Sequence, residues 1–476
     1  MESAAEELVD VAVIGAGTAG LAAYRTASAA GKRVLMVEGG THGTTCARVG
    51  CMPSKLLIAA GEAAHHAEHA GPFGVHATVE VDGRAVMDRV RRERDRFVGF
   101  VIEGVDAIPE DHKVHGLARF VAPGELVVDG ADGKVVRRIK ARAVVIATGS
   151  SPFVPTMFES VRDRLVVNDD VFAWDALPAS VAVFGAGVIG LELGQALSRL
   201  GVRVTTFGRS GTIGPLTDPD VRASALAAFR EEMPIFPDAQ VHGVRRVDGG
   251  VEVSYDDLDG ARRTETFAYA LVAAGRRPNL TRIGLEHAGV RLDSKGLPVF
   301  DRTTLQCVDE HGHGAPVFIA GDANDDVPLL HEASDEGKIA GQNAARFPDV
   351  TAGARRSLLA ITFTEPQLAI AGATYASLEG QADVVTGEVS FVNQGRSRVM
   401  LQNRGLAHVY ADRETGRFLG AELAGPHVEH IGHLLAWAHQ QRLTIDAMLA
   451  MPFYHPVVEE GLRTALRDAG SKITKP

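Results

Sequence analysis

The chain has 476 residues, more than a single hydrophobic core usually serves, so we expect two to four compact units. Its net charge of −11 at pH 7, without a dense block of lysine or arginine, excludes an electrostatic nucleic-acid surface, and we expect no nucleic-acid partner. The N-terminus is acidic and the apolar run after it ends in glycines, which predicts neither a signal peptide nor a membrane span; we therefore expect a cytoplasmic protein with no membrane partner.

A glycine turn between a strand and a helix lies near the N-terminus. Residues 8–14 form an apolar run of strand length, and a helix-like segment follows the turn at 21–27. The turn carries three spaced glycines, Gly15, Gly17 and Gly20. The first permits the tight turn, the second lets a pyrophosphate approach the helix N-terminus, and the third allows close helix–strand packing. A second strand at 33–37 ends in Glu38, which can accept hydrogen bonds from a ribose, so these elements predict a dinucleotide site rather than a plain loop.

Two of the three cysteines, Cys46 and Cys51, are five positions apart. On a helix such residues lie about one and a half turns apart, so they can bridge only at an irregular turn, which Gly50 supplies. Because so short a loop adds little stability and cytosolic thiol pools open structural disulfides, the pair favours a redox role over two buried thiols. Residues 54–60 indicate a helix, so Cys51 lies near an N-terminus that stabilises thiolate. The third cysteine, Cys307, has no cysteine near it in sequence.

The strand–glycine–helix unit occurs again further along the chain. A strand at 180–184 and a helix at 191–197 flank a second set of glycines, Gly185, Gly187 and Gly190. We therefore predict two dinucleotide sites. Counted from the first glycine, Glu38 corresponds to Gly208, and Arg209 follows it. A missing acid beside an arginine suits a 2′-phosphate, so the second site favours NADP(H), although Arg209 can also be an ordinary surface arginine.

Three further strands connect these units. Those at 141–146 and 268–274 each close a nucleotide-binding lobe, and the loops after them contain Thr148, Gly149 and Gly275. The strand at 316–320 leads to Asp322, which can bind a cofactor hydroxyl or serve as a plain turn aspartate. This order indicates a first cofactor domain, an inserted second one, a return to the first, and a new segment from about residue 350.

The C-terminal segment has no glycine fingerprint. It contains strand-like stretches and helices at 358–364, 405–410, 429–441 and 458–469. Pro456 biases His455 toward an extended conformation at the mouth of the last helix, where Glu460 can hold its imidazole. A histidine oriented by a carboxylate is a general acid–base pair, whereas His455 read alone would be a surface histidine. No metal site is predicted.

Together these motifs resemble one family along nearly the whole chain, the FAD-dependent pyridine-nucleotide disulfide oxidoreductases, and within it they are most similar to the dihydrolipoyl dehydrogenases. The resemblance implies an α/β fold of two Rossmann-like FAD- and NAD(P)-binding domains, the second inserted in the first, and a C-terminal α+β dimerisation domain. The expected domains are 1–152 for the first part of the FAD-binding domain, 153–281 for the NAD(P)-binding domain, 282–350 for the return of the FAD-binding domain, and 351–476 for dimerisation.

The resemblance also implies roles for single residues. Cys51 is expected to face the flavin and Cys46 to exchange with substrate sulfur, while His455 and Glu460 serve the disulfide of the other subunit of a homodimer. Lys55 is expected near the flavin, paired with Glu192. Other implied cofactor contacts are the glycines of both turns, Glu38, Thr45, Thr148, Gly149, Arg209, Gly275 and Asp322. The expected activity moves electrons between a small dithiol, dihydrolipoamide or a lipoyl protein, and NAD(P) through FAD.

Three departures bear on substrate and nucleotide. Ala47 and Arg48 replace the leucine and asparagine common between the cysteines, Val457 replaces a threonine, and Gly208 precedes Arg209 where the NAD-dependent enzymes carry an acid. Ser54 matches the lipoamide enzymes better than the glutathione reductases, and without a C-terminal cysteine pair we expect neither a mercuric reductase nor a large thioredoxin reductase. The alternatives are an NADPH-dependent reductase of another small disulfide and a flavoprotein redox sensor without turnover.

Overall fold

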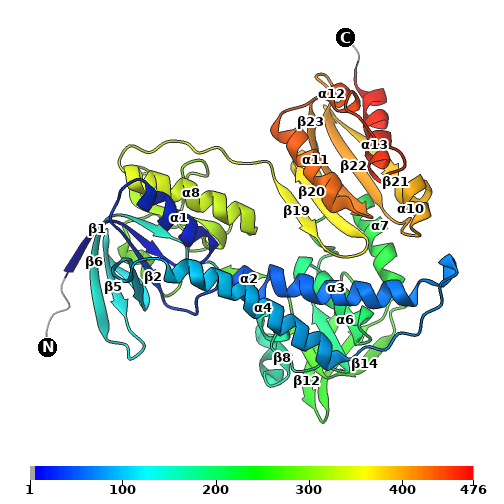
Figure 1. The fold of residues 1–476 in the computed structure, drawn as a ribbon, viewed down its shortest axis with the longest axis horizontal. Coiled ribbons are helices and arrows are strands. Elements are labelled where there is room, and N and C mark those ends of the chain that lie inside the picture. Colours follow the sequence, from blue (N-terminus) through cyan, green and yellow to red (C-terminus); the bar gives the residue numbers. More distant parts are fainter. Residues whose placement is uncertain (1–5, 475–476) are drawn as a thin grey trace. The chain divides into compact units, whose positions relative to one another are not determined.

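The computed structural model describes residues 6–474, so residues 1–5, where we expect no signal peptide, lie outside the described part. The chain forms two compact units, each built from three separate stretches (Figure 1). The first unit comprises Met1–Met52, Arg92–Phe153 and Arg276–Arg355, and the second comprises Pro53–Arg91, Val154–Gly275 and Arg356–Pro476. Within residues 6–474, no helix has both the length and the apolar character needed to cross a bilayer.

A mixed sheet forms the centre of the first unit. Its described strands follow the order β17-β18-β6-β1-β2-β3, and the hairpin β4–β5 pairs with β6. The bounds are β1 Glu6–Ile14, β2 Val34–Glu38, β3 Lys113–His115, β4 Leu117–Ala122, β5 Glu125–Asp129, β6 Val135–Ile146, β17 Gln306–Val308 and β18 Gly314–Ile319. The strands β18, β6, β1, β2 and β3 are parallel, and such strands read as continuous apolar runs because helices cover them.

One face of this sheet packs on a helix pair, α1 (Thr18–Ala29) and α8 (Leu330–Arg346). Glycines set the spacing of the two helices. A Cβ at Gly337 would come 2.2 Å from the carbonyl oxygen of Ala19, and one at Gly341 would come 2.5 Å from that of Ala23. Because only glycine fits at such distances, the backbones of α1 and α8 touch.

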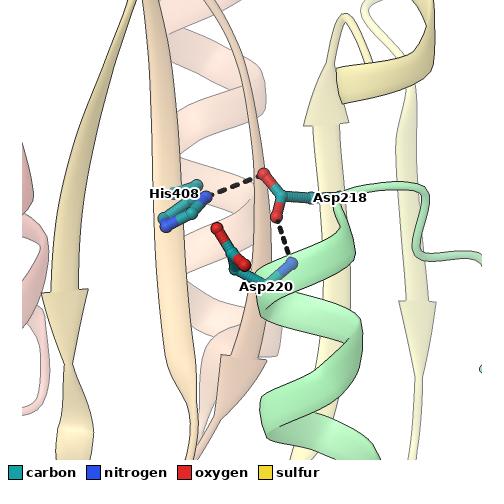
Figure 2. Close-up of side chains that lie close together, drawn as sticks. All are labelled: Asp218, Asp220 and His408. Carbon is teal, nitrogen blue, oxygen red and sulfur yellow. Dashed lines mark hydrogen bonds and ion pairs between the residues drawn. The ribbon is translucent and has the colours of Figure 1, made fainter.

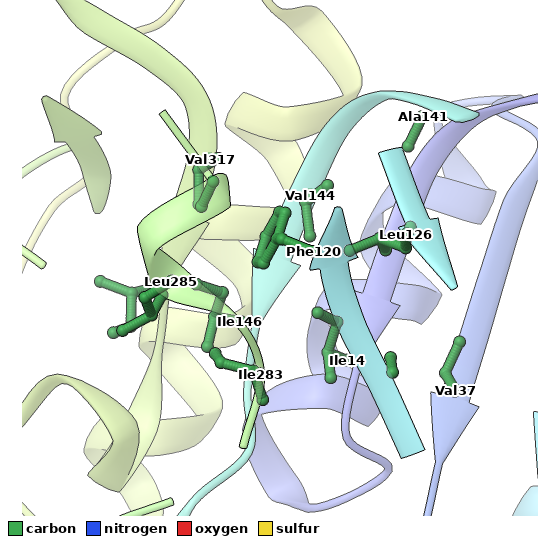
Figure 3. Close-up of a cluster of buried hydrophobic side chains, with 14 of the residues drawn as sticks. Ile14, Val37, Phe120, Leu126, Ala141, Val144, Ile146, Ile283, Leu285 and Val317 are labelled. Atoms are coloured by element: carbon green, nitrogen blue, oxygen red, sulfur yellow. The ribbon is translucent and has the colours of Figure 1, made fainter. Parts of the chain in front are cut away.

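The other face carries the apolar cluster of Figure 3, which draws Ile14, Ile146 and Phe120 among its members. Phe120 is fully buried, and its backbone N–H donates to the carbonyl oxygen of Ile283 at 2.8 Å. The segment around Ile283, which follows the second strand–glycine–helix unit in the chain, therefore packs on the mixed sheet that begins with β1. This contact ties the returning segment to the first unit.

The second unit contains a five-stranded parallel sheet in the order β11-β10-β9-β15-β8. Its strands are β8 Leu165–Val166, β9 Ser180–Phe184, β10 Arg203–Phe207, β11 Ile235–Phe236 and β15 Tyr269–Val272. A three-stranded antiparallel sheet accompanies it, with β12 Val241–Val247, β13 Gly250–Asp256 and β14 Arg262–Phe267. The helices α6 (Val188–Arg199) and α7 (Pro219–Arg230) follow β9 and β10.

An antiparallel sheet in the order β19-β20-β23-β22-β21 completes the second unit. Its strands are β19 Leu359–Thr362, β20 Gln367–Gly372, β21 Val384–Ser390, β22 Leu406–Asp412 and β23 Phe418–Gly425. The helices α11 (Val428–Gln440) and α13 (Glu459–Lys472) pack on it. The α/β class and the α+β character of the C-terminal segment are as expected from the sequence.

Two long helices connect the parts of the chain: α3 (Cys51–Glu68) and α4 (Gly83–Asp106). The sequence places residues 53–91 in the first domain, yet they cluster with the second unit, because Leu57 of α3 packs among Leu193 and Leu197 of α6. The domain boundaries stay a prediction. The remaining short elements are α2 Thr45–Val49, α5 Asn168–Val171, α9 Tyr375–Leu378, α10 Gly395–Val399, α12 Ile445–Leu449, β7 Ser150–Pro152 and β16 Arg276–Pro278.

Candidate functional site

The cysteine pair lies where two helices meet. Cys46 belongs to α2 and is half-buried, while Cys51 begins α3 and is exposed. Between them, Gly50 leaves the helical conformation at φ −127° and ψ −118°, and a Cβ there would come 3.1 Å from the carbonyl oxygen of Thr45. The irregular turn expected at Gly50 is therefore present, and Cys51 lies at the N-terminal end of α3, where the helix dipole favours its thiolate. Thr45 itself is exposed in the first turn of α2.

Cys307, in contrast, is fully buried in the first unit. Burial raises the pKa of its thiol, since a thiolate is poorly solvated among apolar side chains. It is therefore a packing residue and not a nucleophile.

The first glycine turn has the geometry of an anion site. Gly15 has φ +109°, and a Cβ there would come 2.3 Å from the carbonyl oxygen of Ala147. A Cβ at Gly20 would come 1.9 Å from the oxygen of Gly15, so the helix is close against the strand. Gly17, in contrast, has no atom within 4 Å of its Cβ position, and it precedes α1 without a side-chain cap or an acid in the first turn. Open space thus adjoins an uncapped helix N-terminus, as a pyrophosphate requires.

Polar groups of the first unit surround this turn. Glu38 Oε2 accepts from the backbone N–H of Ala16 at 2.7 Å, so the carboxylate lies directly beside the turn. Asp322 Oδ2 accepts from Ser150 Oγ at 2.7 Å. The hydroxyl oxygen of Thr148 is buried and makes no hydrogen bond within the described residues. A buried hydroxyl without a partner is costly, so these groups fit a bound dinucleotide such as FAD that supplies one.

The second glycine turn repeats this geometry in the second unit. Gly185 has φ +125° with a Cβ position 2.3 Å from the carbonyl oxygen of Ala273, and the Cβ position of Gly190 lies 1.9 Å from the oxygen of Gly185. Gly187 again adjoins open space and precedes α6 without a side-chain cap. Two other predicted contacts are glycines with positive φ, Gly149 at +66° and Gly275 at +106°. The two predicted dinucleotide turns therefore have matching backbones.

Gly208 has a second reason to lack a side chain. A Cβ there would come 2.8 Å from the carbonyl oxygen of Pro237, and the Gly208 N–H donates to the oxygen of Phe236 at 2.7 Å. The absence of an acid is thus also a packing requirement. Arg209 is exposed and makes no ion pair with any residue in 6–474, so its charge is available to a ligand. The nearby carboxylate of Asp238 accepts from the Ser210 N–H at 3.0 Å.

Lys55 and Glu192 form a close ion pair, although 137 positions separate them. Lys55 Nζ lies 2.9 and 2.8 Å from the two carboxylate oxygens of Glu192, and 4.6 Å from the centroid of the Phe363 ring. The Phe363 N–H donates to Glu192 at 3.0 Å. The Glu192 carboxylate is therefore fully engaged inside the second unit, which holds the ammonium group of Lys55 in one place.

His455 and Glu460 are also together. His455 Nδ1 lies 3.1 Å from both oxygens of Glu460, and 81% of the histidine side chain is exposed. The hydrogen bond from His455 lowers the pKa of the Glu460 carboxyl. The pair thus has an ionised orienting carboxylate and an accessible Nε2, as a general acid–base needs.

A pocket of about 570 Å³ opens beside Cys46 in the first unit. Its walls come from α1, α2, α4 and α8, with Met52 from the start of α3, and include Arg25, Phe97, Phe100 and Lys338. None of these four residues was predicted from the sequence. A signal existed for α4 in its helix-spaced apolar residues, whereas the convergence of α1, α4 and α8 on Cys46 depends on long-range packing.

A separate polar cluster lies in the second unit (Figure 2). Ligand atoms of Asp218, Asp220 and His408 lie within 4.8 Å of one another, close enough for one metal ion. Both ring nitrogens of His408 are engaged, however: Nδ1 lies 2.7 Å from Asp218 and Nε2 lies 3.0 Å from Glu388. Burial lowers the pKa of His408, but these two hydrogen bonds outweigh it and raise the pKa overall. We interpret the cluster as a hydrogen-bonded ion pair.

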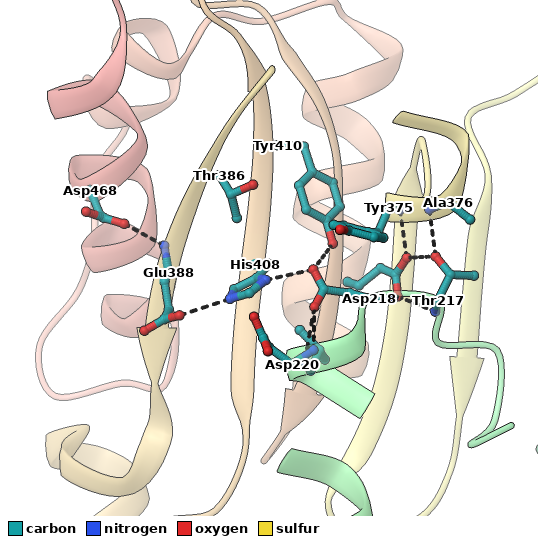
Figure 4. Close-up of polar contacts among 12 residues, drawn as sticks. Thr217, Asp218, Asp220, Tyr375, Ala376, Thr386, Glu388, His408, Tyr410 and Asp468 are labelled. Atoms are coloured by element: carbon teal, nitrogen blue, oxygen red, sulfur yellow. Dashed lines mark hydrogen bonds and ion pairs between the residues drawn. The ribbon is translucent and has the colours of Figure 1, made fainter. Parts of the chain in front are cut away.

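Figure 4 shows how this ion pair continues across the second unit. Asp218 also accepts from Tyr410 at 2.8 Å and caps α7 through the N–H of Asp220 at 3.0 Å. The network therefore connects the N-terminus of α7 to β22 of the C-terminal sheet.

The comparisons with known sequences cover nearly the whole chain. Residues 9–337 match the profile of the pyridine nucleotide-disulphide oxidoreductases, and residues 359–466 match the dimerisation domain of the same family. The dihydrolipoyl dehydrogenases of Halobacterium salinarum and Haloferax volcanii are each 30% identical to this chain, over 97% of its length and 96% of theirs. That of Rhizobium etli is 29% identical over 98% of this chain and 99% of its own.

Two solved structures have the same fold. LpdA from Mycobacterium tuberculosis superposes with a TM-score of 0.82 at 24% identity, covering 96% of this chain and 99% of that one. The HOCl-induced flavoprotein disulfide reductase RclA from Escherichia coli superposes with a TM-score of 0.77 at 21% identity, covering 98% and 100%.

Proposed function

Because the chain belongs to the pyridine nucleotide-disulphide oxidoreductase family, we propose that it is a dihydrolipoyl dehydrogenase-like enzyme that moves electrons between a small dithiol or disulfide and NAD(P). One observation carries the proposal: Cys46 and Cys51 flank a helix break, and the unit that holds them also holds the first glycine turn. The overall reaction is balanced as dithiol plus NAD(P)⁺ giving disulfide, NAD(P)H and one proton.

The two cysteines have different tasks in this reaction. A substrate thiolate attacks Cys46 Sγ, the Cys46–Cys51 bond breaks, and Cys51 leaves as a thiolate that the N-terminus of α3 stabilises. The second substrate thiol then attacks the mixed disulfide and releases Cys46 as a thiol, so the substrate is oxidised and the cysteine pair is reduced. The FAD that the family implies supplies two-electron transfer between this pair and the nicotinamide, and the glycine turn with Glu38, Thr148 and Asp322 would hold it.

Proton transfer falls to the His455–Glu460 pair. In a homodimer, His455 of the second subunit would take the proton of the attacking substrate thiol, while Glu460 stabilises the resulting imidazolium. The match of residues 359–466 to a dimerisation domain supports the homodimer. Exposed large apolar side chains in the same segment support it too, since Trp437 is 65% exposed and Tyr454, beside His455, is 80% exposed.

The test is anaerobic steady-state kinetics with dihydrolipoamide against NAD and NADP. We expect NAD(P)H to form from dihydrolipoamide, Cys46→Ser to abolish its formation, and Cys307→Ala to retain it as the matched control for losing a thiol. A holoenzyme that oxidises no dihydrolipoamide with either nucleotide would contradict the proposal.

For the nucleotide we propose a preference for NADP(H), supported by the unpaired exposed charge of Arg209 in the described chain. A charge-assisted hydrogen bond to a 2′-phosphate contributes about 1.5–3 kcal/mol, so Arg209→Ala should lower kcat/KM for NADP by roughly ten- to a hundredfold. NAD, which lacks the phosphate, is the internal control. Because Gly208 tolerates no Cβ, a glutamate at that position is not a usable reciprocal test. Arg209→Gln, which removes the charge but keeps a long polar side chain, should weaken NADP use in the same direction as Arg209→Ala. If the wild type prefers NAD and Arg209→Ala leaves that preference unchanged, Arg209 is an ordinary surface residue without a role in nucleotide binding.

Arg209 also favours a second candidate, an NADPH-dependent reductase of another small disulfide. Assays with oxidised glutathione and NADPH distinguish the two candidate functions. The second candidate predicts that kcat/KM for NADPH-dependent disulfide reduction exceeds kcat/KM for dihydrolipoamide oxidation. A sensor without turnover would need no acid–base pair, so the His455–Glu460 geometry weighs against it.

A further inference from the structure

The Arg209 loop, residues 208–218, connects β10 to α7 in the second unit. Three of its residues have a positive φ: Ser210 at +57°, Gly211 at +68° and Gly214 at +54°. Glycine adopts many backbone conformations at little cost, so a loop of this composition can take several shapes. Contacts with other segments must therefore hold it in the one observed.

The first half of the Arg209 loop is attached to the second glycine turn and to the segment after β11. The Ser210 N–H donates to the carboxylate of Asp238 at 3.0 Å. The Gly214 N–H donates to the carbonyl oxygen of Ala186 at 2.8 Å, and Ala186 lies between the first two glycines of the second turn. The position of the loop is therefore linked directly to that of the turn.

The second half of the loop is held by a buried carboxylate of the C-terminal sheet. Glu422 of β23 has no solvent exposure. Its Oε2 accepts from the backbone N–H groups of Thr217 at 2.7 Å and Asp218 at 2.9 Å. Its Oε1 accepts from the Thr217 hydroxyl at 2.5 Å and from the N–H of Tyr375 at 2.8 Å. Three of these four donors belong to the Arg209 loop.

No cation neutralises the Glu422 carboxylate within residues 6–474. His408 lies directly opposite Glu422 in the β22–β23 ladder, yet its ring nitrogens pair with Asp218 and Glu388 instead. Burying a carboxylate without a cation is costly unless hydrogen bonds compensate for the lost water. The donors of the loop supply most of these bonds, so the burial of Glu422 depends on the loop and the loop depends on Glu422.

Apolar contacts keep the same two elements together. Ile213 of the loop is fully buried in one cluster with Leu368 of β20. A Cβ at Gly214 would come 2.6 Å from Cδ1 of Leu368, so the loop backbone lies directly on the sheet. Because apolar contacts are not directional, they hold the loop against the sheet, whereas the hydrogen bonds of Glu422 define its conformation.

We propose that Glu422 is a positioning residue for the second nucleotide site, which holds the Arg209 loop so that Arg209 meets the 2′-phosphate of NADP(H). The inference rests on the proposed function for the role of Arg209. It places part of the nucleotide selection in the segment that matches the dimerisation domain, outside residues 9–337. A loop that is ordered before binding loses less entropy on binding, so the anchor favours the nucleotide that engages Arg209.

Nucleotide binding to the oxidised holoenzyme tests this role without turnover. Isothermal titration calorimetry with NADP⁺ and with NAD⁺ gives a selectivity ratio, the Kd for NAD⁺ divided by the Kd for NADP⁺. No electrons move, because the protein and both nucleotides are oxidised. Glu422→Gln keeps the shape of the side chain, but its amide nitrogen must face at least one backbone N–H of Thr217, Asp218 or Tyr375. We expect the selectivity ratio to fall about three- to tenfold.

A pair of variants at Thr217 tests the same contact from the loop. Thr217→Val removes the hydroxyl bond to Glu422 with little change of shape, so it should lower the selectivity ratio by a smaller factor than Glu422→Gln. Thr217→Ser keeps the hydroxyl and should retain the wild-type ratio. If Glu422→Gln yields no folded holoenzyme, this pair decides alone.

Leu423→Val is the matched control for disturbing β23. The side chain of Leu423 is buried on the opposite face of the strand, in the cluster that includes residues of α11 and α13. The variant therefore opens a small cavity away from the Arg209 loop. It should leave the selectivity ratio unchanged.

A double variant shows whether Glu422 acts through Arg209. If it does, Arg209→Ala combined with Glu422→Gln should have the same selectivity ratio as Arg209→Ala alone, whereas independent effects would multiply. Multiplied effects overturn the inference. A ratio that both Glu422→Gln and Thr217→Val leave at the wild-type value also overturns it.

The outcomes separate this inference from the proposed function. If Arg209→Ala lowers the selectivity ratio and the Glu422 and Thr217 variants do not, the inference fails while the nucleotide proposal stands. A ratio that Arg209→Ala leaves unchanged overturns both. A coupled ratio in a protein that oxidises no dihydrolipoamide supports the inference while the proposed dithiol activity fails.

Discussion

Replacing His408 by leucine should open the N-terminal turn of α7. The side chains of His408 and Asp218 are only 7% and 2% exposed, and 2.7 Å separates their bonded atoms. Removing one partner of a buried ion pair costs about 3–5 kcal/mol. We expect about 3 kcal/mol, at the lower end, because Asp218 keeps its bonds to Tyr410 and to the N–H of Asp220. The bond to Glu388 adds little, since that carboxylate is 56% exposed.

The effect depends on pH with a defined sign. Because the pKa of His408 is raised in the folded state, its contribution is complete below the unfolded value of about 6.5 and is lost as pH rises through the folded pKa. Burial raises the pKa of Asp218, but the bonds from His408 and Tyr410 outweigh it and lower the pKa overall. Its contribution is present above the unfolded value of about 3.9 and is lost as pH falls through the folded pKa. The stabilisation is therefore greatest between about pH 4 and 6.5.

Amide hydrogen exchange measures this local opening without requiring two-state unfolding of the whole chain. The peptide to follow is 217–223, whose N–H groups include those bonded to Asp218. At pH 6 the opening free energy of this peptide should be about 3 kcal/mol lower in His408→Leu than in the wild type. The difference should be smaller at pH 9. His242→Leu, which removes a partly exposed pair with Asp256, is the control and should leave this peptide unchanged. Equal deficits at both pH values would refute the assignment of a protonated His408.

Two further predictions concern the cofactor and the acid–base pair. Thr148→Val should preserve or raise the stability of the cofactor-free protein, because it removes a buried hydroxyl without a partner. The same variant should weaken FAD binding by roughly tenfold, measured by equilibrium dialysis. An unchanged FAD affinity would contradict a hydrogen bond between Thr148 and the bound dinucleotide. His455→Gln should retain FAD and fold but lower dithiol turnover by about 10²–10⁴, and heterodimers with Cys46→Ser should recover roughly one working site; inactive heterodimers would place both residues in one subunit.

Local patterns predicted the elements that carry their own signal. Both strand–glycine–helix units were predictable, because the residues next to Gly15 and Gly185 define a turn whose conformation requires glycine. The break between Cys46 and Cys51 was predictable for the same reason, from Gly50 alone. The expected pairs Lys55–Glu192 and His455–Glu460 are both present, but the first came only from the resemblance, since nothing local connects residues 137 positions apart.

The features that sequence reasoning missed depend on contacts between distant segments. Arg25 and Lys338 reach one pocket because glycines of α8 let it touch α1, and no pattern in either helix indicates that meeting. His408 meets Asp218 across 190 positions, and its pKa is a consequence of that contact. Gly208 lacks a side chain partly because Pro237 lies close to it. From the sequence alone, the glycine was interpreted only as a sign of preference for NADP(H).

We propose that Cys46 and Cys51 form a disulfide that NAD(P)H opens. The direct measurement is anaerobic alkylation of the native holoenzyme with iodoacetamide, before and after one equivalent of NADPH or NADH per subunit, followed by peptide mass spectrometry. We predict that both cysteines become alkylated only after reduction, that the buried Cys307 stays unlabelled throughout, and that Cys46→Ser shows no change with reductant. Equal labelling of Cys46 and Cys51 with and without the nucleotide would contradict the account.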